Sequence, residues 1–264
     1  MKVQFSKYHG TGNDFIIIDG RDRELKSLDR SGIQFLCDRR FGIGADGLII
    51  LISSEKHDFR MIYFNADGRE GTMCGNGGRC ITAFARSLGI TGQRATFESV
   101  DGIHRSEILP DGDIRLMLMD VEGIQSTGDG YLLHTGSPHF VVFVDRLQEL
   151  DVETEGRAIR HHARFGREGT NVNFVEPGPN DGEILVRTFE RGVEAETLSC
   201  GTGVTASAIS AFCHFETDIL SYRITTRGGV LKVSFETKDR IRFSPVWLTG
   251  PASHVFDGEV EIRS

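Results

Sequence analysis

Apolar residues recur along the chain at two spacings, one typical of strands and the other typical of helices. Runs rich in apolar residues at 15–18, 48–52 and 59–64 predict buried strands. A three- and four-residue spacing of apolar residues follows Cys74, and an uncharged, apolar run follows Cys200. We therefore expect a helix directly after each of these cysteines, between segments that form strands.

Turn residues separate the remaining strands of the first half. The segments 96–100, 103–109 and 114–119 are joined by Asp101-Gly102 and by Pro110-Asp111-Gly112, a pattern typical of an antiparallel meander. Helices and hairpins therefore share one half of the chain, which indicates an α/β fold with mixed sheets.

The second half of the chain repeats the order of the first. Five pairs of anchor residues keep a separation of 124 to 127 residues: Phe15 and Phe140, Phe41 and Phe165, Phe64 and Phe189, Cys74 and Cys200, Gly102 and Gly229. We predict two pseudo-symmetric repeats, each a curved, mixed and largely antiparallel sheet around a central helix. The active site is expected in the cleft between them.

A Gly-rich polar stretch at residues 122–130 marks the expected boundary between the repeats. We assign residues 1–122 to an N-terminal repeat and residues 123–248 to a C-terminal repeat. The tail, residues 249–264, alternates between apolar and polar positions. This alternation predicts a final strand that completes the first repeat.

Composition narrows the classes of function. The chain has 264 residues, 39% of them hydrophobic, and a net charge of −8 with dispersed basic residues. These values favour a globular protein with a small-molecule partner over one that binds nucleic acid or an anionic membrane. Because no apolar run is long enough for a membrane span or a signal peptide, we expect a cytoplasmic location.

The five cysteines divide into two groups. Cys37, Cys80 and Cys213 lie in apolar helical segments and are expected to be buried, reduced thiols. The five cysteines are an odd number without the spacing of a disulfide framework, and Cys74 and Cys80 lack a zinc-ligand spacing, so no metal is predicted. Cys74 and Cys200 each precede a helix, where unpaired backbone N–H groups can lower a thiol pKa from about 8.5 to roughly 3.5–7.5.

Two such thiols suit the inversion of a carbon centre. Inversion requires a base on one face and an acid on the other, and a thiolate–thiol pair can exchange these roles. Backbone N–H groups at the two helix ends would stabilise a substrate carboxylate as it takes on negative charge, so that no electron-sink cofactor is needed. The residues that carry these groups are Gly75, Asn76, Gly201 and Thr202. A single Cys-Gly-x-Gly more often forms a tight turn into a buried helix, but here the motif is duplicated.

Six segments match the motifs of one family in order. They are His9-Gly10-Thr11-Gly12-Asn13-Asp14-Phe15, Phe64-Asn65-Ala66-Asp67-Gly68, Met73-Cys74-Gly75-Asn76-Gly77, Gly169-Thr170-Asn171-Val172-Asn173-Phe174, Glu190-Arg191-Gly192 and Cys200-Gly201-Thr202-Gly203. Over nearly its whole length the chain resembles the diaminopimelate epimerases.

The resemblance implies an isomerase that interconverts LL-2,6-diaminopimelate and meso-diaminopimelate without pyridoxal phosphate or any other cofactor, in lysine and cell-wall precursor biosynthesis. It also implies a homodimer. The catalytic residues implied are the thiol pair Cys74 and Cys200, assisted by His139 and Glu190. The distal ammonium and carboxylate of the substrate would be bound by Asn13, Asn65, Asn171, Glu190 and Arg191.

Two positions depart from the family pattern. Gly47 stands where many members have a glutamine that touches substrate, and Ser137 stands where many have an asparagine. Gly47 cannot donate a side-chain hydrogen bond, so we leave it out of the predicted site. What takes over the contacts of the two replaced side chains is left open.

Two alternatives remain open. A proline racemase-like enzyme, or another cofactor-independent amino-acid racemase of the same fold, would share both thiols, but Arg191 and the three asparagines argue for a longer substrate. A phosphate- or nucleotide-binding module would also use a Gly-rich loop before a helix, yet neither loop is followed by Lys-Ser or Lys-Thr. The sequence does not assign which cysteine acts on which stereoisomer.

Overall fold

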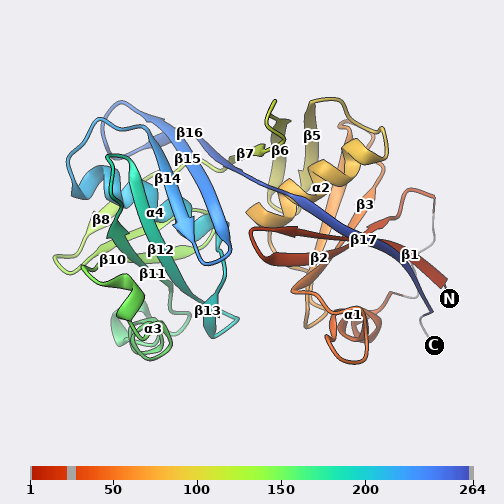
Figure 1. Ribbon diagram of the computed structural model, residues 1–264, viewed down its shortest axis with the longest axis horizontal. Coiled ribbons are helices and arrows are strands. Elements are labelled where there is room, and N and C mark those ends of the chain that lie inside the picture. The colour runs from red at the N-terminus through yellow and green to blue at the C-terminus, as the bar shows by residue number, and fades with distance from the viewer. Residues whose placement is uncertain (1, 23–27, 262–264) are drawn as a thin grey trace. The chain divides into compact units, whose positions relative to one another are not determined.

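The computed structural model describes residues 2–22 and 28–261 of the chain (Figure 1). The chain forms two compact units. Unit 1 contains Met1–Leu116 and Gly250–Ser264, and unit 2 contains Met117–Thr249.

Unit 1 is a mixed sheet with two helices, α1 (Arg30–Cys37) and α2 (Gly75–Ser87). Neighbouring strands are antiparallel except for the parallel pairs β2–β3 and β4–β5. In spatial order the strands are β17 (Ser253–Glu261), β1 (Lys2–Gly10), β2 (Asn13–Asp19), β3 (Gly47–Ile52), β4 (Phe59–Asn65), β5 (Arg94–Ser99), β6 (Gly102–Ile108) and β7 (Ile114–Leu118).

The two helices of unit 1 cover opposite faces of its sheet. Ile16 and Ile18 of β2 share a core cluster with Ile33 of α1. Because side chains alternate along a strand, the intervening residues point to the other face, where Ile49 of β3 meets Gly77 of α2. Burial on both faces explains why β2 and β3 are almost continuously apolar.

Unit 2 is also mixed and largely antiparallel, and its parallel pairs are β10–β11 and β12–β14. Its helices are α3 (Val152–Arg160), α4 (Gly201–His214) and the 3-10 turns η1 (Leu147–Glu149) and η2 (Ala163–Phe165). Its strands are β8 (Ile124–Ser126), β9 (Tyr131–His134), β10 (Pro138–Phe143), β11 (Asn171–Pro177), β12 (Glu183–Glu190), β13 (Ala195–Thr197), β14 (Ser221–Thr226), β15 (Gly229–Thr237) and β16 (Phe243–Gly250).

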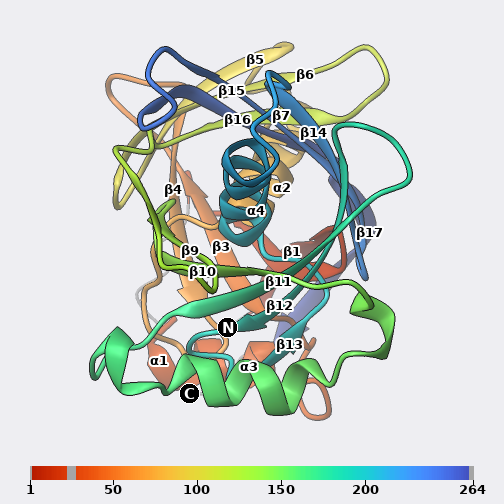
Figure 2. The same cartoon turned by 90° about the vertical axis from the view of Figure 1, so that its left-hand side faces the viewer.

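Helix α4 is the buried centre of unit 2. Every residue from Gly203 to Phe212 is buried, which matches the absence of charge in this segment. Figure 2 shows β10, β11 and β12 between α4 and α3. On the α3 side, Val152 packs with Phe174 and Phe189 in a second core cluster. The predicted α/β class, with a mixed and largely antiparallel sheet around a helix, is confirmed.

Helices α1 and α3 are short. Helix α1 ends at Cys37, because the Asp38 carboxylate accepts the backbone N–H groups of Arg40 and Phe41 and turns the chain. Helix α3 ends at Arg160 and is followed by η2.

Near the end of the chain, β17 pairs antiparallel with β1 over nearly all of β1, from Lys2 opposite Glu261 to His9 opposite Ser253. The chain therefore returns to unit 1 after completing unit 2. Within residues 2–22 and 28–261, no helix has both the length and the apolar character needed to cross a membrane.

Gly156 allows α3 to approach the sheet, which makes it a test of this packing. A Cβ atom at position 156 would lie 2.4 Å from Cβ of Phe189. We expect Gly156→Ala to lower the free energy of unfolding by about 1–3 kcal/mol, as overpacking does, measured from the urea midpoint. Gly92→Ala is the control, because a Cβ there meets nothing within 4 Å. Equal midpoints for the two variants would contradict this account of the packing.

Candidate active site

In unit 1, Cys74 is the residue that precedes α2. Its backbone is extended, with φ −104° and ψ 125°, and its carbonyl accepts the first helical bond from the N–H of Gly78 at 2.7 Å. Its side chain makes no capping hydrogen bond to the helix. Instead, the half-buried thiol donates to Oδ1 of Asn13 at 3.5 Å. The first N–H groups of α2 have no acceptor within the helix and so suit an anionic ligand.

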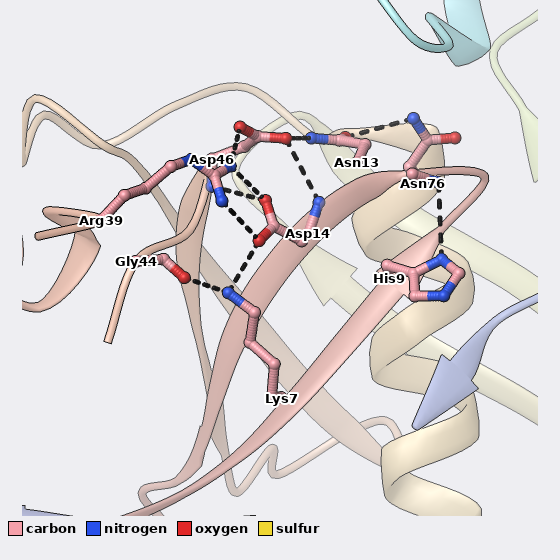
Figure 3. Close-up of polar contacts among 9 residues, drawn as sticks. Lys7, His9, Asn13, Asp14, Arg39, Gly44, Asp46 and Asn76 are labelled. Carbon is pink, nitrogen blue, oxygen red and sulfur yellow. Dashed lines mark hydrogen bonds and ion pairs between the residues drawn. The ribbon is translucent and has the colours of Figure 1, made fainter. Parts of the chain in front are cut away.

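The amide of Asn13 is held on both sides (Figure 3). Its Nδ2 donates to Oδ2 of Asp46 at 2.7 Å, and its Oδ1 accepts from Nδ2 of Asn76 at 3.1 Å. A carboxylate can only accept, so Nδ2 of Asn13 has to face Asp46. The oxygen of Asn13 is therefore the atom that meets Cys74.

Ion pairs fix the strand that carries Asn13. Lys7 is buried and pairs with Asp14 at 2.8 Å, while Arg39 binds both oxygens of Asp14 and also reaches Asp46 at 2.8 Å. Burial raises the pKa of Asp14, but hydrogen bonds and charge from Arg39 and Lys7 lower it to about 2. Asp14 is thus ionised near neutral pH, and the start of β2 is held by this network.

In unit 2, Cys200 precedes α4 in the same way. Its backbone is extended, its carbonyl accepts from the N–H of Val204 at 2.9 Å, and its side chain makes no capping hydrogen bond to the helix. The thiol is buried, and Sγ lies 3.5 Å from Oγ1 of Thr202. The two cysteines therefore have the same place in their units but different partners.

His139 of β10 is fully buried beside this thiol. Burial lowers its pKa to about 3, so the imidazole is neutral near pH 7. Nδ2 of Asn173 donates to the carbonyl of Phe140 at 3.3 Å and lies 3.0 Å from Nδ1 of His139. Because that amide nitrogen is a donor, Nδ1 accepts and the ring proton is assigned to Nε2.

The proton on Nε2 sets the direction of the next hydrogen bond. Nε2 lies 2.9 Å from Oγ1 of Thr202 and 3.0 Å from Oγ of Ser137. Thr202 can therefore accept from His139 and turn its own hydroxyl proton toward Cys200. A donor beside sulfur favours the thiolate.

Asn171 joins three segments near this site. Its Nδ2 donates to Oγ of Ser137 at 3.1 Å and to the carbonyl of Pro138 at 3.0 Å, and its Oδ1 accepts the backbone N–H of Arg191 at 2.8 Å. Glu190 accepts from Oγ1 of Thr197 at 3.0 Å. Ser137, which the sequence left unassigned, thus lies within hydrogen-bond distance of His139.

Tyr63 fills the space beside Gly47. A Cβ atom at position 47 would lie 2.5 Å from the Tyr63 ring, and one at Gly71 would lie 2.7 Å from it. The phenol donates to Oδ1 of Asn65 at 3.1 Å. A hydrogen-bonding side chain therefore occupies the place that a glutamine at position 47 would need.

The structure brings the predicted residues together in two groups. In unit 1, Cys74, Asn76 and Asn13 are joined by hydrogen bonds, and Asn65 contacts Tyr63. In unit 2, a chain of close polar contacts joins Cys200, Thr202, His139, Ser137, Asn171 and Arg191.

Sequence reasoning missed several polar residues of these groups. Tyr63, Arg79, Asp46 and Asn173 are examples. For Asn173 the sequence holds a signal, because an asparagine between the apolar residues Val172 and Phe174 of a buried strand rarely lacks a polar partner. Among the described residues, no group of three or more His, Cys, Asp or Glu side chains lies close enough to hold a metal ion.

Comparison with known proteins gives matches over nearly the whole chain. The family model described as diaminopimelate epimerase matches residues 5–122 and 131–255. Diaminopimelate epimerase of Flavobacterium psychrophilum is 47% identical over 256 residues, 97% of this chain and 99% of that protein. The enzyme of the same name from Chlorobaculum tepidum is 43% identical over 262 residues, 96% of this chain and 99% of that protein.

Solved structures share the fold at much lower identity. A phenazine biosynthesis protein of the PhzF family from Bacillus anthracis has a TM-score of 0.78 at 16% identity, over 99% of this chain and 100% of that one. A probable proline racemase from Agrobacterium radiobacter has a TM-score of 0.71 at 16% identity, over 99% and 93% of the two chains. The sequence matches confirm the resemblance drawn from the motifs: the chain belongs to the diaminopimelate epimerase family and is an isomerase.

Proposed function

We propose that this protein interconverts LL- and meso-diaminopimelate, with Cys74 and Cys200 as the two acid–base groups and without pyridoxal phosphate. The observation that carries the proposal is the duplicated arrangement of a cysteine directly before a buried helix, once in each unit. Membership of the epimerase family supports diaminopimelate as the substrate.

In the proposed reaction one thiolate removes the α-proton of the substrate, and the other thiol returns a proton to the opposite face. The substrate carboxylate takes on negative charge as the proton leaves. The groups proposed to stabilise it are the first N–H groups of α2 and α4, on Gly75, Asn76, Gly201 and Thr202. Donors aimed at a developing anion lower the barrier, and loss of one typically costs about 10²–10³ in rate.

The hydrogen-bond partners of the two thiols support different protonation states for Cys74 and Cys200 in the free enzyme. Asn13 offers Cys74 an acceptor, which favours the thiol, whereas Thr202 can donate to Cys200, which favours the thiolate. We therefore assign Cys200 as the base and Cys74 as the acid in the free enzyme. His139 acts through Thr202 in this assignment.

The remaining residues are proposed to recognise the far end of diaminopimelate. This substrate has an ammonium and a carboxylate at that end, which suit carboxylate, amide and guanidinium partners. Asn13, Asn65, Asn171, Glu190 and Arg191 are the side chains that we assign to this role. The bond from Asn171 to the backbone of Arg191 supports a fixed arrangement of two of them.

We also propose that the enzyme works in the cytoplasm as a homodimer in lysine and cell-wall precursor biosynthesis. The pathway follows from the family, and the homodimer rests on the same resemblance. The net charge of −8 supports a small-molecule partner over nucleic acid.

Deuterium incorporation tests the function directly. Purified protein without added cofactor is mixed with LL-diaminopimelate in D₂O, and the products are followed by NMR and mass spectrometry. We expect meso-diaminopimelate with deuterium at one α-carbon, because the returned proton comes from an exchangeable thiol. Racemisation of proline in place of this conversion would favour the proline racemase-like alternative, and no exchange with either substrate would exclude both.

Alanine at either helix end tests the two-thiol mechanism. Cys74→Ala and Cys200→Ala should each lower kcat/KM by at least about 10³, because acid and base both act in one inversion. Cys213→Ala is a matched control. Burial raises the pKa of the Cys213 thiol, which favours its protonated form, and the hydrogen bond found for this sulfur goes to the backbone carbonyl of Arg240. Near-normal turnover in either test variant would remove that cysteine from the mechanism.

Tyr63→Phe tests the role of the residue beside Gly47. This change keeps the ring but removes the hydroxyl that donates to Asn65 at 3.1 Å. If Asn65 binds substrate, KM should rise by about 3- to 10-fold with kcat nearly unchanged, which corresponds to a hydrogen bond of about 0.5–1.5 kcal/mol. An unchanged KM would show that the phenol does not support substrate binding.

A further inference from the structure

Arg79 of α2 is a completely buried cation whose hydrogen-bond partners are all neutral. Its exposed fraction is 0%. Within the described residues it forms no ion pair with a carboxylate. Its acceptors are Oδ1 of Asn76 at 2.9 Å, the carbonyls of Gly75 and Pro251 at 3.3 Å each, and Oγ1 of Thr11 at 3.4 Å. Burial of a charge without a compensating anion is strongly unfavourable, so the burial of this guanidinium has to be explained by a role in the protein.

Three ionisable groups act on Arg79 from its surroundings. Burial lowers the pKa of Arg79, and Cys80, Cys74 and Asp113 oppose this effect in that order. Burial raises the pKa of Cys80 to about 12, so this thiol is neutral near pH 7. Asp113 acts more weakly than either thiol. Of the two remaining groups, Cys74 therefore acts on Arg79 more strongly than Asp113, and it gains its negative charge when its thiol ionises.

Hydrogen bonds also lead from Arg79 to Cys74. A guanidinium can only donate, so Oδ1 of Asn76 has to face Arg79, and Nδ2 of Asn76 is left to donate to Asn13. Oδ1 of Asn13 then meets the thiol of Cys74 at 3.5 Å. Figure 3 shows Asn13 between Asn76 and Asp46. Two groups of fixed polarity, Arg79 and Asp46, thus set the orientation of both amides.

Gly10 makes room for this arrangement. A Cβ atom at position 10 would lie 3.1 Å from Nη2 of Arg79 and 3.1 Å from the carbonyl of Asn76. The end of β1 therefore packs directly on the guanidinium and keeps water away from it. In a dry site, a charge acts more strongly on its neighbours.

Unit 2 lacks this cation at the corresponding position. The two cysteines are 126 residues apart, and the same offset from Arg79 leads to Thr205. Thr205 donates only to the carbonyl of Gly201, at 2.9 Å. The buried arginine is therefore a feature of unit 1, and the Cys200 thiol provides the internal reference for its effect on Cys74.

We propose that Arg79 is a positioning residue for Cys74: its buried charge stabilises the Cys74 thiolate, and its bond to Asn76 holds the amide pair that faces the thiol. The inference rests on the proposed two-thiol function. A thiol that alternates between acid and base visits both protonation states. Asn13 stabilises the protonated state of Cys74, and Arg79 stabilises the ionised one.

The experiment compares Arg79→Gln with Arg79→Lys. Glutamine can still donate to Asn76 but has no charge, whereas lysine keeps the charge. The first readout is alkylation by iodoacetamide, which consumes the thiolate; peptide mass spectrometry gives the rates of Cys74 and Cys200 in the same molecule. In Arg79→Gln we expect the Cys74 rate to fall about 10-fold relative to the Cys200 rate. In Arg79→Lys the ratio should stay within about threefold of the parent.

The second readout is how the effect of the substitution divides between kcat and KM. Arg79→Gln should lower kcat by about 10- to 100-fold, because loss of the charge destabilises the Cys74 thiolate, and change KM by less than about threefold. Thr82→Val is the matched control. Thr82 is also buried on α2 and bonded to Gly78 and Ser106, so its loss reports general damage to the helix. This control should leave the alkylation ratio unchanged.

The proposal is overturned if Arg79→Gln keeps the parental alkylation ratio, or if Thr82→Val changes the ratio as much. Should the glutamine variant not fold, Gly10→Ala displaces the guanidinium without removing it. That variant should slow Cys74 alkylation several-fold, and an unchanged ratio would equally overturn the proposal. Failure of the two-thiol function has a different signature, namely full turnover by Cys74→Ala, whatever the alkylation ratios are.

Discussion

Each unit buries the amino end of a helix, and the proposed function requires the first N–H groups of that helix to reach a ligand. Glycines in the first turn make this close packing possible. A Cβ atom at Gly77 would lie 3.1 Å from Ile49, and one at Gly203 would lie 2.4 Å from Asn173. The strands can therefore pack directly against the start of each helix, beside the cysteine that precedes it.

The two units surround equivalent thiols with different chemistry. Unit 1 uses formal charges: Asp46 and Arg79 orient two amides beside Cys74. Unit 2 uses a neutral imidazole whose proton position is fixed by an amide and a backbone carbonyl. The two units thus share the arrangement of a cysteine before a buried helix and differ in the partners of the thiol. An asymmetric pair suits a reaction whose two faces need an acid and a base at the same moment.

Sequence reasoning succeeded where the information was local. Apolar periodicity located the strands and both central helices, and the residue before a helix could be identified from the glycines that follow it. The partners of Asn13 could not be predicted, because Asp46 lies 33 residues away and meets it only through the parallel pairing of β2 with β3. Arg79 was missed for a related reason: a single arginine in a helix is usually exposed, and here strand β1 covers it.

The packing of Tyr63 between Gly47 and Gly71 has an evolutionary consequence. A Cβ atom at position 47 would lie 2.5 Å from the Tyr63 ring and 2.7 Å from the backbone carbonyl of Phe64, so glycine is required as long as the ring and this backbone keep their places. A lineage that gained glutamine at position 47 would have to shrink position 63 and also shift the backbone at Phe64. Positions 47, 63 and 71 are therefore coupled, and descendants of this enzyme cannot fill position 47 by a single substitution without strain.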